Sequence, residues 1–213
     1  MPALEVLRRP AYPRSAQYDF QWQVDLCMGP NPLWLLEDLL RDVELRPGMR
    51  VLDLGCGLGM TSVFLAREYD VQVVAADHWI PAAANQRRFD EAGLGGRVQA
   101  VDAEARALPF QQGEFDAIVS IGTYHYFGTD DLYLGYVTRF LKPHGILAIA
   151  SLASTVEARE LGGLPEHVRA IAGPEALSFH TAEWWRFHWE ESRHVAVTAV
   201  RSQPVSPHRS PGS

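Results

Sequence analysis

The chain has 213 residues, of which 47% are hydrophobic, and its 19 basic and 26 acidic side chains give a formal net charge of −7. This length and composition predict one globular domain rather than a disordered polymer, and the acidic balance argues against a surface that binds nucleic acid. No apolar run approaches the roughly 18 residues of a membrane span, and the N-terminus lacks the apolar segment of a secretory signal. We therefore expect a cytoplasmic protein whose two cysteines, Cys27 and Cys56, are reduced thiols.

Residues 1–30 show no clear periodicity and predict an N-terminal arm or lid. A helix is expected next, with Asn31 as its N-cap and Pro32 at its first position. Beyond the turn at Pro47-Gly48, short apolar runs alternate with segments of helical period, which is typical of parallel βαβ units. The predicted strands are Val51–Leu54, Val71–Ala76, Val98–Val101, Ala117–Ile121 and Ile146–Ala150. The predicted helices between them are Met60–Tyr69, Pro81–Ala92 and Asp130–Leu141.

The C-terminal part of the chain carries weaker signals. Thr181 is the expected N-cap of a short helix that runs through Trp189. Its residues 184–189, which all carry rings except Arg186, either pack on the sheet or roof an apolar or cationic ligand pocket. His194–Val200 predicts one more strand, and residues 203–213, rich in Pro, Ser and Gly, predict a disordered tail.

This order of elements predicts a Rossmann-like, doubly wound α/β fold, with a mostly parallel sheet and helices on both faces. Its most informative segment is the loop after the first strand, which contains Gly55, Gly57 and Gly59. Glycines there let the backbone turn sharply and let a ligand approach without an intervening Cβ. The dinucleotide-binding fingerprint is incomplete, because Met60 stands where its third glycine belongs. Asp53 would also repel a pyrophosphate, and it suits a cationic ligand.

Over roughly residues 48–152 the sequence resembles the class I S-adenosylmethionine-dependent methyltransferases, whose first motif is an acid followed by GxGxG. The resemblance implies that S-adenosyl-L-methionine is the cofactor and that residues 31–202 form the methyltransferase domain. Carried over by position, Asp53 and the three loop glycines would line the methionine and ribose part of the cofactor. Asp77, which closes the second strand, would bind the ribose hydroxyls, and Asp102, at the end of the third strand, would accept from the adenine amino group. The expected cofactor contacts also include Cys56, His78, Ala103 and Ser120.

The loop that follows the fourth strand is expected to face the transferred methyl group, because ligands of open α/β sheets bind beyond the carboxyl ends of the strands. His125 is the candidate general base, and Tyr124 and Tyr126 are candidate walls or hydrogen-bonding partners for the acceptor. The alternative is that His125 is a structural residue bonded to the backbone, since a well-positioned sulfonium needs no base.

The resemblance leaves one structural question and several functional alternatives open. The family's sheet ends with a sixth and a seventh strand, so this sheet is one strand short, another chain completes it in a homodimer, or a short strand lies near Leu177–Phe179. We expect methyl transfer to a small-molecule acceptor, with no metal, nucleic acid or membrane partner. The alternatives are a nicotinamide-dependent oxidoreductase, which Asp53 and Met60 argue against, a cyclopropane-fatty-acid-type synthase, which needs a basic lipid-binding face, and a cofactor-binding protein without turnover.

Overall fold

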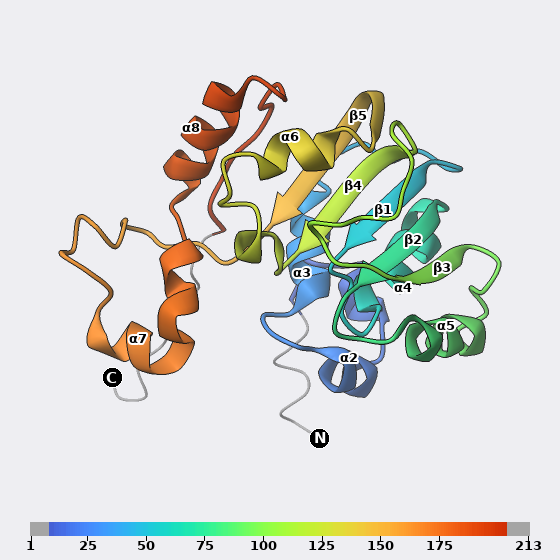
Figure 1. The fold of residues 1–213 in the computed structure, drawn as a ribbon. Coiled ribbons are helices and arrows are strands. Elements are labelled where there is room, and N and C mark those ends of the chain that lie inside the picture. Colours follow the sequence, from blue (N-terminus) through green and yellow to red (C-terminus); the bar gives the residue numbers. More distant parts are fainter. Residues whose placement is uncertain (1–8, 204–213) are drawn as a thin grey trace. The chain divides into compact units, whose positions relative to one another are not determined.

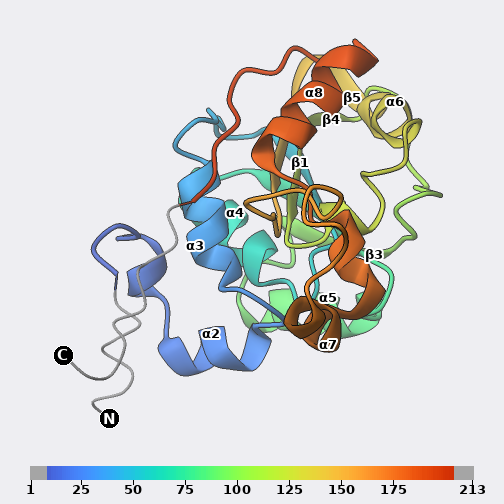
Figure 2. The same cartoon turned by 90° about the vertical axis from the view of Figure 1, so that its left-hand side faces the viewer.

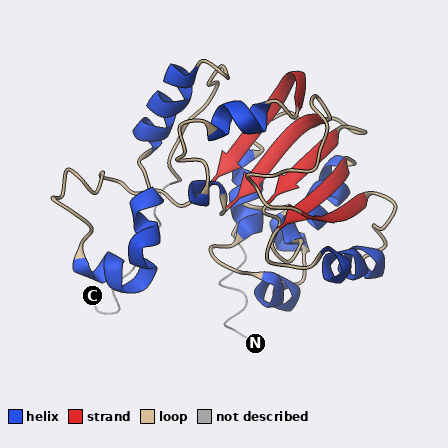
Figure 3. Ribbon diagram, in the orientation of Figure 1, coloured by secondary structure: helices blue, strands red, loops and turns tan. Residues whose placement is uncertain are grey.

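The computed structural model describes residues 9–203 and divides the chain into two compact units, residues 1–152 and residues 153–213. The first unit is built around a five-stranded sheet of order β3-β2-β1-β4-β5, in which every neighbouring pair is parallel (Figures 1 and 3). Its strands are β1 (Arg50–Leu54), β2 (Gln72–Asp77), β3 (Val98–Asp102), β4 (Phe115–Ile121) and β5 (Leu141–Ala150). The predicted α/β fold with a parallel sheet is therefore confirmed.

The helices of this unit follow from the right-handed crossovers that join parallel strands. The chain moves from β1 outward to β3 through α4 (Met60–Tyr69) and α5 (Ala82–Glu91), and then returns past β1 to form β4 and β5. Because the direction of travel reverses at β1, α6 (Tyr133–Thr138) lies on the opposite face from α4 and α5 (Figure 1). The sheet order therefore switches between β1 and β4, where ligands of such folds bind.

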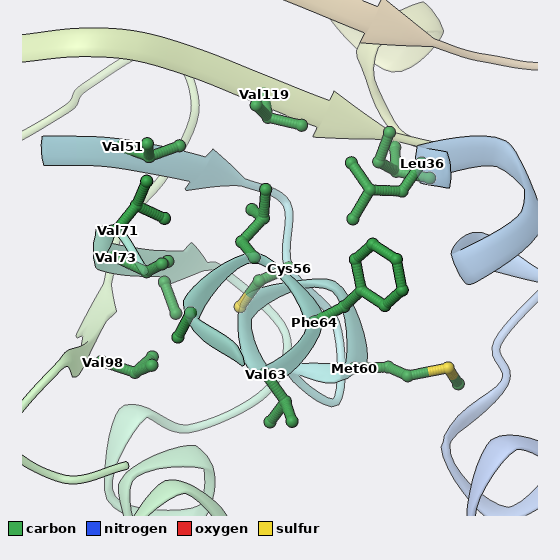
Figure 4. Close-up of a cluster of buried hydrophobic side chains, with 14 of the residues drawn as sticks. Leu36, Val51, Cys56, Met60, Val63, Phe64, Val71, Val73, Val98 and Val119 are labelled. Carbon is green, nitrogen blue, oxygen red and sulfur yellow. The ribbon is translucent and has the colours of Figure 1, made fainter. Parts of the chain in front are cut away.

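The hydrophobic core lies between the sheet and the helices α3 (Pro32–Leu39) and α4, which run side by side in Figure 2. Figure 4 shows Phe64 of α4 beside Leu36 of α3, with Val51 and Val119 projecting from β1 and β4 toward the same cluster. All four side chains are fully buried. This packing fixes the start of α4, and with it the glycine loop that leads into the helix.

The N-terminal arm contains more regular structure than its sequence indicates. A single 3-10 turn at Ser15–Gln17 is followed by α2 (Phe20–Leu26), whose N-cap Asp19 accepts a hydrogen bond from the backbone N–H of Trp22 at 2.8 Å. The buried carboxylate of Glu37, in α3, accepts from the backbone N–H of Ser15 at 2.7 Å. The arm is therefore docked on α3 through a buried side-chain acceptor.

The second unit contains α7 (Glu166–Ala172), a 3-10 segment at Gly173–Ser178 and α8 (Ala182–Ser192). Thr181 caps α8 as predicted, since its Oγ1 accepts from the N–H of Trp184 at 3.1 Å. The ring of Trp184 stacks on His180 with centroids 3.7 Å apart and on His188 with centroids 4.7 Å apart. Within this unit, part of the aromatic segment therefore forms a column along one face of α8.

The helix predicted over residues 130–141 was too long at both ends. Asp130 makes a turn by accepting from the N–H of Leu132 at 2.9 Å, and the helix proper ends at Thr138. Leu141 already belongs to β5, where it pairs with Phe115, and Lys142 and Pro143, which follow the predicted helix, lie inside this strand. The last predicted helical turn is thus a strand in the structure, because Leu141 pairs with β4, and a local sequence pattern does not contain such pairing.

The strand predicted over residues 194–200 was wrong, because these residues form no strand in the described chain. Their alternating, β-branched sequence has the local preference, but a strand needs a partner for its backbone groups. Residues 177–179 do not supply the missing strand either, since they lie at the end of a 3-10 segment. Over the described residues β5 is thus an end strand of the sheet, with β3 at the opposite end. The tail predicted to be disordered lies outside the described residues except for Gln203.

Candidate functional site

Two of the loop glycines are required by close packing. A Cβ on Gly55 would lie 2.4 Å from the Oγ1 of Thr123, and a Cβ on Gly59 would lie 2.6 Å from the ring of Phe89. Thr123 belongs to the loop after β4, and Phe89 belongs to α5. The glycine loop is therefore pressed between the structures that follow β4 and β2, and these two glycines are explained without a ligand.

Gly57 has a different environment, because its peptide group is held from both sides. Its N–H donates to the Oδ2 of Asp77 at 2.8 Å, and its carbonyl accepts from the Nδ2 of the buried Asn85 at 2.8 Å. It has a φ of 53°, and a Cβ built on it would lie 3.0 Å from the Sδ of Met28. The arm residue Met28 thus occupies the space in front of the glycine whose backbone the sequence predicts to meet a ligand.

Asp53 is a buried carboxylate at the root of this loop, with 1% of its surface exposed. Its Oδ2 accepts from the hydroxyls of Thr61 and Ser62, each at 2.6 Å, from the first turn of α4. Its Oδ1 has no hydrogen-bond partner among the described residues. Burial raises the pKa of Asp53 to about 6, against the lowering effect of the two hydroxyl bonds. A cationic group near Oδ1 would supply the missing partner and favour the ionised form.

Asp77 and Asp102 end the neighbouring strands β2 and β3 and are direct register partners. The Oδ1 of Asp77 accepts from the N–H groups of Trp79 and Ile80 at 2.8 and 3.0 Å, and its Oδ2 accepts from Gly57. Since each carboxylate oxygen offers two lone pairs, one acceptor position is left, on Oδ2. The carboxylate of Asp77, which the resemblance predicts to bind the ribose hydroxyls, is thus already occupied by backbone donors at all but one of its acceptor positions.

The other residues predicted to contact the cofactor make backbone contacts, are exposed or lie in the core. Asp102 accepts from the N–H of Ala82 at 2.6 Å, at the start of α5. The N–H of Ala103 donates to the carbonyl of Asp77 at 2.9 Å, and His78 is exposed. Burial raises the pKa of the Cys56 thiol well above its ordinary value, so this thiol is protonated within the core.

The loop after β4 places its predicted residues under the surface. The Oγ of Ser120 lies 2.9 Å from the Oγ1 of Thr123, which also donates to the carbonyl of Leu54 at 3.2 Å and so ties this loop to β1. Tyr124 is fully buried and packs edge-on against Phe127. Burial raises the pKa of Tyr124 above its ordinary value, so its hydroxyl stays protonated.

His125 is also fully buried, and its Nδ1 lies 2.6 Å from the Oγ of Ser151, just past the end of β5. Burial lowers the pKa of His125 to about 4, so the imidazole is neutral at neutral pH. A neutral imidazole is able to accept a proton, but this one is shielded from solvent. His125 lies at the carboxyl edge of the sheet, next to the exposed Tyr126. The centroids of these two rings are 4.1 Å apart.

Sequence reasoning missed Asn85 and Thr123, which hold the glycine loop in place. Asn85 follows three alanines in the first turn of α5, and a polar residue on the buried face of a helix is the signal that would have found it. Thr123 gives no such local signal, because its contact with Gly55 joins segments 68 residues apart in sequence.

Residues 9–203 offer neither a metal cluster nor a membrane span. No cluster of three or more His, Cys, Asp or Glu side chains is placed to hold a metal ion. None of the helices there has the length and apolar character that crossing a membrane requires.

The comparisons with known proteins match this chain to methyltransferases and to a related synthase. A family model for a methyltransferase domain matches residues 51–145. The cyclopropane-fatty-acyl-phospholipid synthase of Escherichia coli (strain K12) is 36% identical over 121 residues, which are 56% of this chain and 30% of that protein. The demethylmenaquinone methyltransferase of Thermus thermophilus is 32% identical over 178 residues, covering 71% of this chain and 80% of that protein.

A solved structure shares the fold. Phosphoethanolamine N-methyltransferase 2 of Haemonchus contortus, in complex with S-adenosyl-L-methionine, superposes with a TM-score of 0.67 at 21% identity, over 89% of this chain and 44% of that one. The chain thus spans less than a third of the Escherichia coli relative and about four fifths of the Thermus relative.

Proposed function

This chain belongs to the class I S-adenosylmethionine-dependent methyltransferases, and we propose that it transfers a methyl group from S-adenosyl-L-methionine to a small-molecule acceptor. The observation that carries this proposal is Asp53, a buried carboxylate at the root of the glycine loop whose Oδ1 has no partner among the described residues. A buried charge without a full set of partners costs folding free energy, and a cationic ligand offsets that cost. S-adenosyl-L-methionine carries both a sulfonium and an ammonium group.

The residues at the carboxyl edge fit this ligand in distinct ways. We propose that the loop at Gly57 meets the cofactor along its backbone, once Met28 has turned away. Asp77 offers its one remaining acceptor position, on Oδ2, to a ribose hydroxyl, and Asp102 lies on the next strand for the adenine amino group. Cys56, Ala103 and Ser120 shape this edge from beneath rather than through exposed polar atoms.

When bound, the cofactor supplies an activated methyl group on a sulfonium. The protein's part is then to hold the acceptor in line with that methyl and to exclude water, and positioning of this kind is worth on the order of 7–11 kcal/mol. We propose His125 as the proton acceptor for an acceptor that must lose a proton, because it lies at the carboxyl edge of the sheet beside Ser151. Burial, which lowers its pKa to about 4, makes it a weak base, so this role requires the loop after β4 to open toward the acceptor. The burial of Tyr124 supports a role in holding this loop.

Binding and turnover test the proposal. Isothermal titration is expected to show saturable binding of S-adenosyl-L-methionine and S-adenosylhomocysteine and none of NADH. Formation of S-adenosylhomocysteine is then followed with amines, phosphoethanolamine, quinols, fatty acids and vesicles of unsaturated phospholipid as acceptors. Tighter binding of NADH than of S-adenosylhomocysteine would replace methyl transfer by an oxidoreductase function, and binding without turnover of any acceptor would indicate a cofactor-binding protein.

A second candidate is a cyclopropane-fatty-acid-type synthase. It is favoured by the 36% identity with the Escherichia coli synthase, of which this chain covers 30%. Turnover with the phospholipid vesicles alone would select it. The net charge of −7 supports the small-molecule acceptor, because neither nucleic acid nor anionic lipid is attracted to an acidic surface.

We also propose that the protein acts in the cytoplasm, and that a homodimer forms if another chain completes the sheet at β5. Fractionation and light scattering test these two statements. A monomer in solution would exclude the homodimer.

A further inference from the structure

Two exposed aromatic side chains meet beyond the carboxyl ends of β2 and β4. Trp79 is 72% exposed and Tyr126 is 42% exposed, yet their ring centroids lie only 6.4 Å apart, with an angle of 48° between the ring planes. Single exposed aromatics need no explanation, because folded surfaces carry many apolar atoms. A contact between two such rings from separate loops above a candidate ligand site does need one.

The position of this pair follows from the strand order. β1 lies between β2 and β4, and neighbouring strands are about 4.8 Å apart, so the ends of β2 and β4 are separated by roughly 10 Å. Rings that start from these two ends and touch must therefore bridge across the end of β1, where the glycine loop begins. The sheet order also switches here, between β1 and β4, which is where ligands of this fold class bind.

The backbones of both residues are held while their side chains are exposed. The N–H of Trp79 donates to the Oδ1 of Asp77 at 2.8 Å. The N–H of Tyr126 donates to the carbonyl of Thr123 at 3.0 Å, and its own carbonyl accepts from Arg106 at 3.0 Å. Opening of this pair therefore takes rotation about the side-chain bonds, in which the ring of Tyr126 also moves against that of His125, whose centroid is 4.1 Å away.

The rings leave no room for a ligand group between them. A planar group held between two rings needs roughly 7 Å, because each carbon contact takes about 3.5 Å, whereas these tilted rings are 6.4 Å apart. We propose that Trp79 and Tyr126 form an aromatic gate over the cofactor site, which parts to admit the cofactor and closes again behind it. This inference rests on the proposed function, because it takes S-adenosyl-L-methionine and its product as the molecules that pass.

The strength of the contact sets the size of the effect. An aromatic pair of this kind favours contact over separation by an equilibrium ratio of about 2 to 12. The gate is then open for about one third to one thirteenth of the time, and it slows association by about 3- to 13-fold. By microscopic reversibility it slows dissociation equally, so a gate leaves the Kd unchanged. A residue that binds the cofactor directly behaves differently, because its loss weakens the Kd.

Surface plasmon resonance on the immobilised full chain, with S-adenosylhomocysteine as the probe, measures both rates. In Trp79→Ala and in Tyr126→Ala we expect the association and dissociation rate constants to rise together by about 3- to 13-fold, with the Kd within about twofold of the wild type. The double variant is expected to be no faster than the faster single variant, because removing either ring already opens the gate. Tyr126→Phe is the matched control, since it keeps the ring and therefore the slow rates.

Three results would overturn the gate. Unchanged rates in both alanine variants would show that the rings do not obstruct the site, and a weaker Kd with an unchanged association rate would make them direct ligand contacts. Effects that multiply in the double variant would show that the rings act independently. If the wild type itself fails to bind S-adenosylhomocysteine, the proposed function falls and the gate falls with it, whereas the other three results leave the proposed function intact. Equal melting temperatures for all variants exclude a loss of folding as the cause.

Discussion

Replacing Gly57 by alanine has two separable effects. It lowers the stability of the protein through backbone strain, and it weakens cofactor binding if this loop meets the cofactor. Gly57 has a φ of 53°, a region that costs an L side chain about 1–2 kcal/mol. The Cβ would lie 3.0 Å from the Sδ of Met28, and this end of a flexible, 56% exposed side chain is able to turn away. The backbone cost therefore sets the magnitude. At about 2–4 °C per kcal/mol for a chain of this size, Gly57→Ala is expected to lower the Tm by roughly 2–8 °C.

Gly48→Ala is the matched control, because Gly48 has a φ of 81° and a Cβ there would meet no atom within 4 Å. Both variants are expected to lose similar stability in thermal unfolding. In titrations with S-adenosylhomocysteine, Gly48→Ala should bind like the wild type and Gly57→Ala at least about tenfold more weakly, a loss of about 1.4 kcal/mol or more. Gly57→Val should bind below detection, because its side chain is branched. Equal affinity of Gly57→Ala and Gly48→Ala would refute the assignment of this loop to the cofactor.

Three further predictions concern titratable side chains. Burial raises the pKa of Asp53 from 3.8 to about 6, so the folded state keeps a proton that the unfolded chain loses between about pH 4 and 6. The resulting loss of stability grows with pH to about 3 kcal/mol in total. The difference in unfolding free energy between Asp53→Asn and the wild type should therefore grow by about 2 kcal/mol from pH 4 to 7 in urea titrations, and parallel curves would contradict it. Asp77→Ala should weaken S-adenosylhomocysteine by about 1.5–3 kcal/mol in calorimetry, and an unchanged Kd would remove Asp77 from the site. Because burial lowers the pKa of His125 to about 4, turnover should be flat from pH 6 to 8, and His125→Ala should lower kcat by about 10²–10⁴. A variant that keeps more than about a tenth of the wild-type turnover removes His125 from the proposed catalytic residues.

The sequence predicted those parts of the fold that depend on local chemistry. Asn31 accepts from two backbone N–H groups at the start of α3, as an N-cap does, and Thr181 does the same for α8 with one. The apolar runs marked all five strands, and they were clearest for β1, β2 and β4, which are buried over most of their length as inner strands of a parallel sheet are. The helix α2 escaped notice because its amphipathic signal is short, although Asp19 three residues before Trp22 is a capping pattern.

The candidate site was predictable to the same extent. Acids at the ends of successive parallel strands must meet at one edge, and the register pair Asp77–Asp102 shows that they do. What these side chains already bind depends on loops that approach from elsewhere, so the three backbone donors to Asp77 and the clamp of Asn85 on Gly57 lay beyond sequence reasoning. The contact of Met28 with this loop also needed the folded arm.

The end strand β5 bears on how this protein resists aggregation. An unpaired strand edge is a template for another chain, and long flat edges are the dangerous ones. The first half of β5 is protected, because Pro143 offers no N–H, His144 has a φ of 62°, and the register with β4 shifts between Phe115 and Ala117. Only Ile146–Ala150 keeps a regular ladder with β4. Any strand that adds to this edge is thereby limited to about five residues, which is too short for an extended cross-β stack.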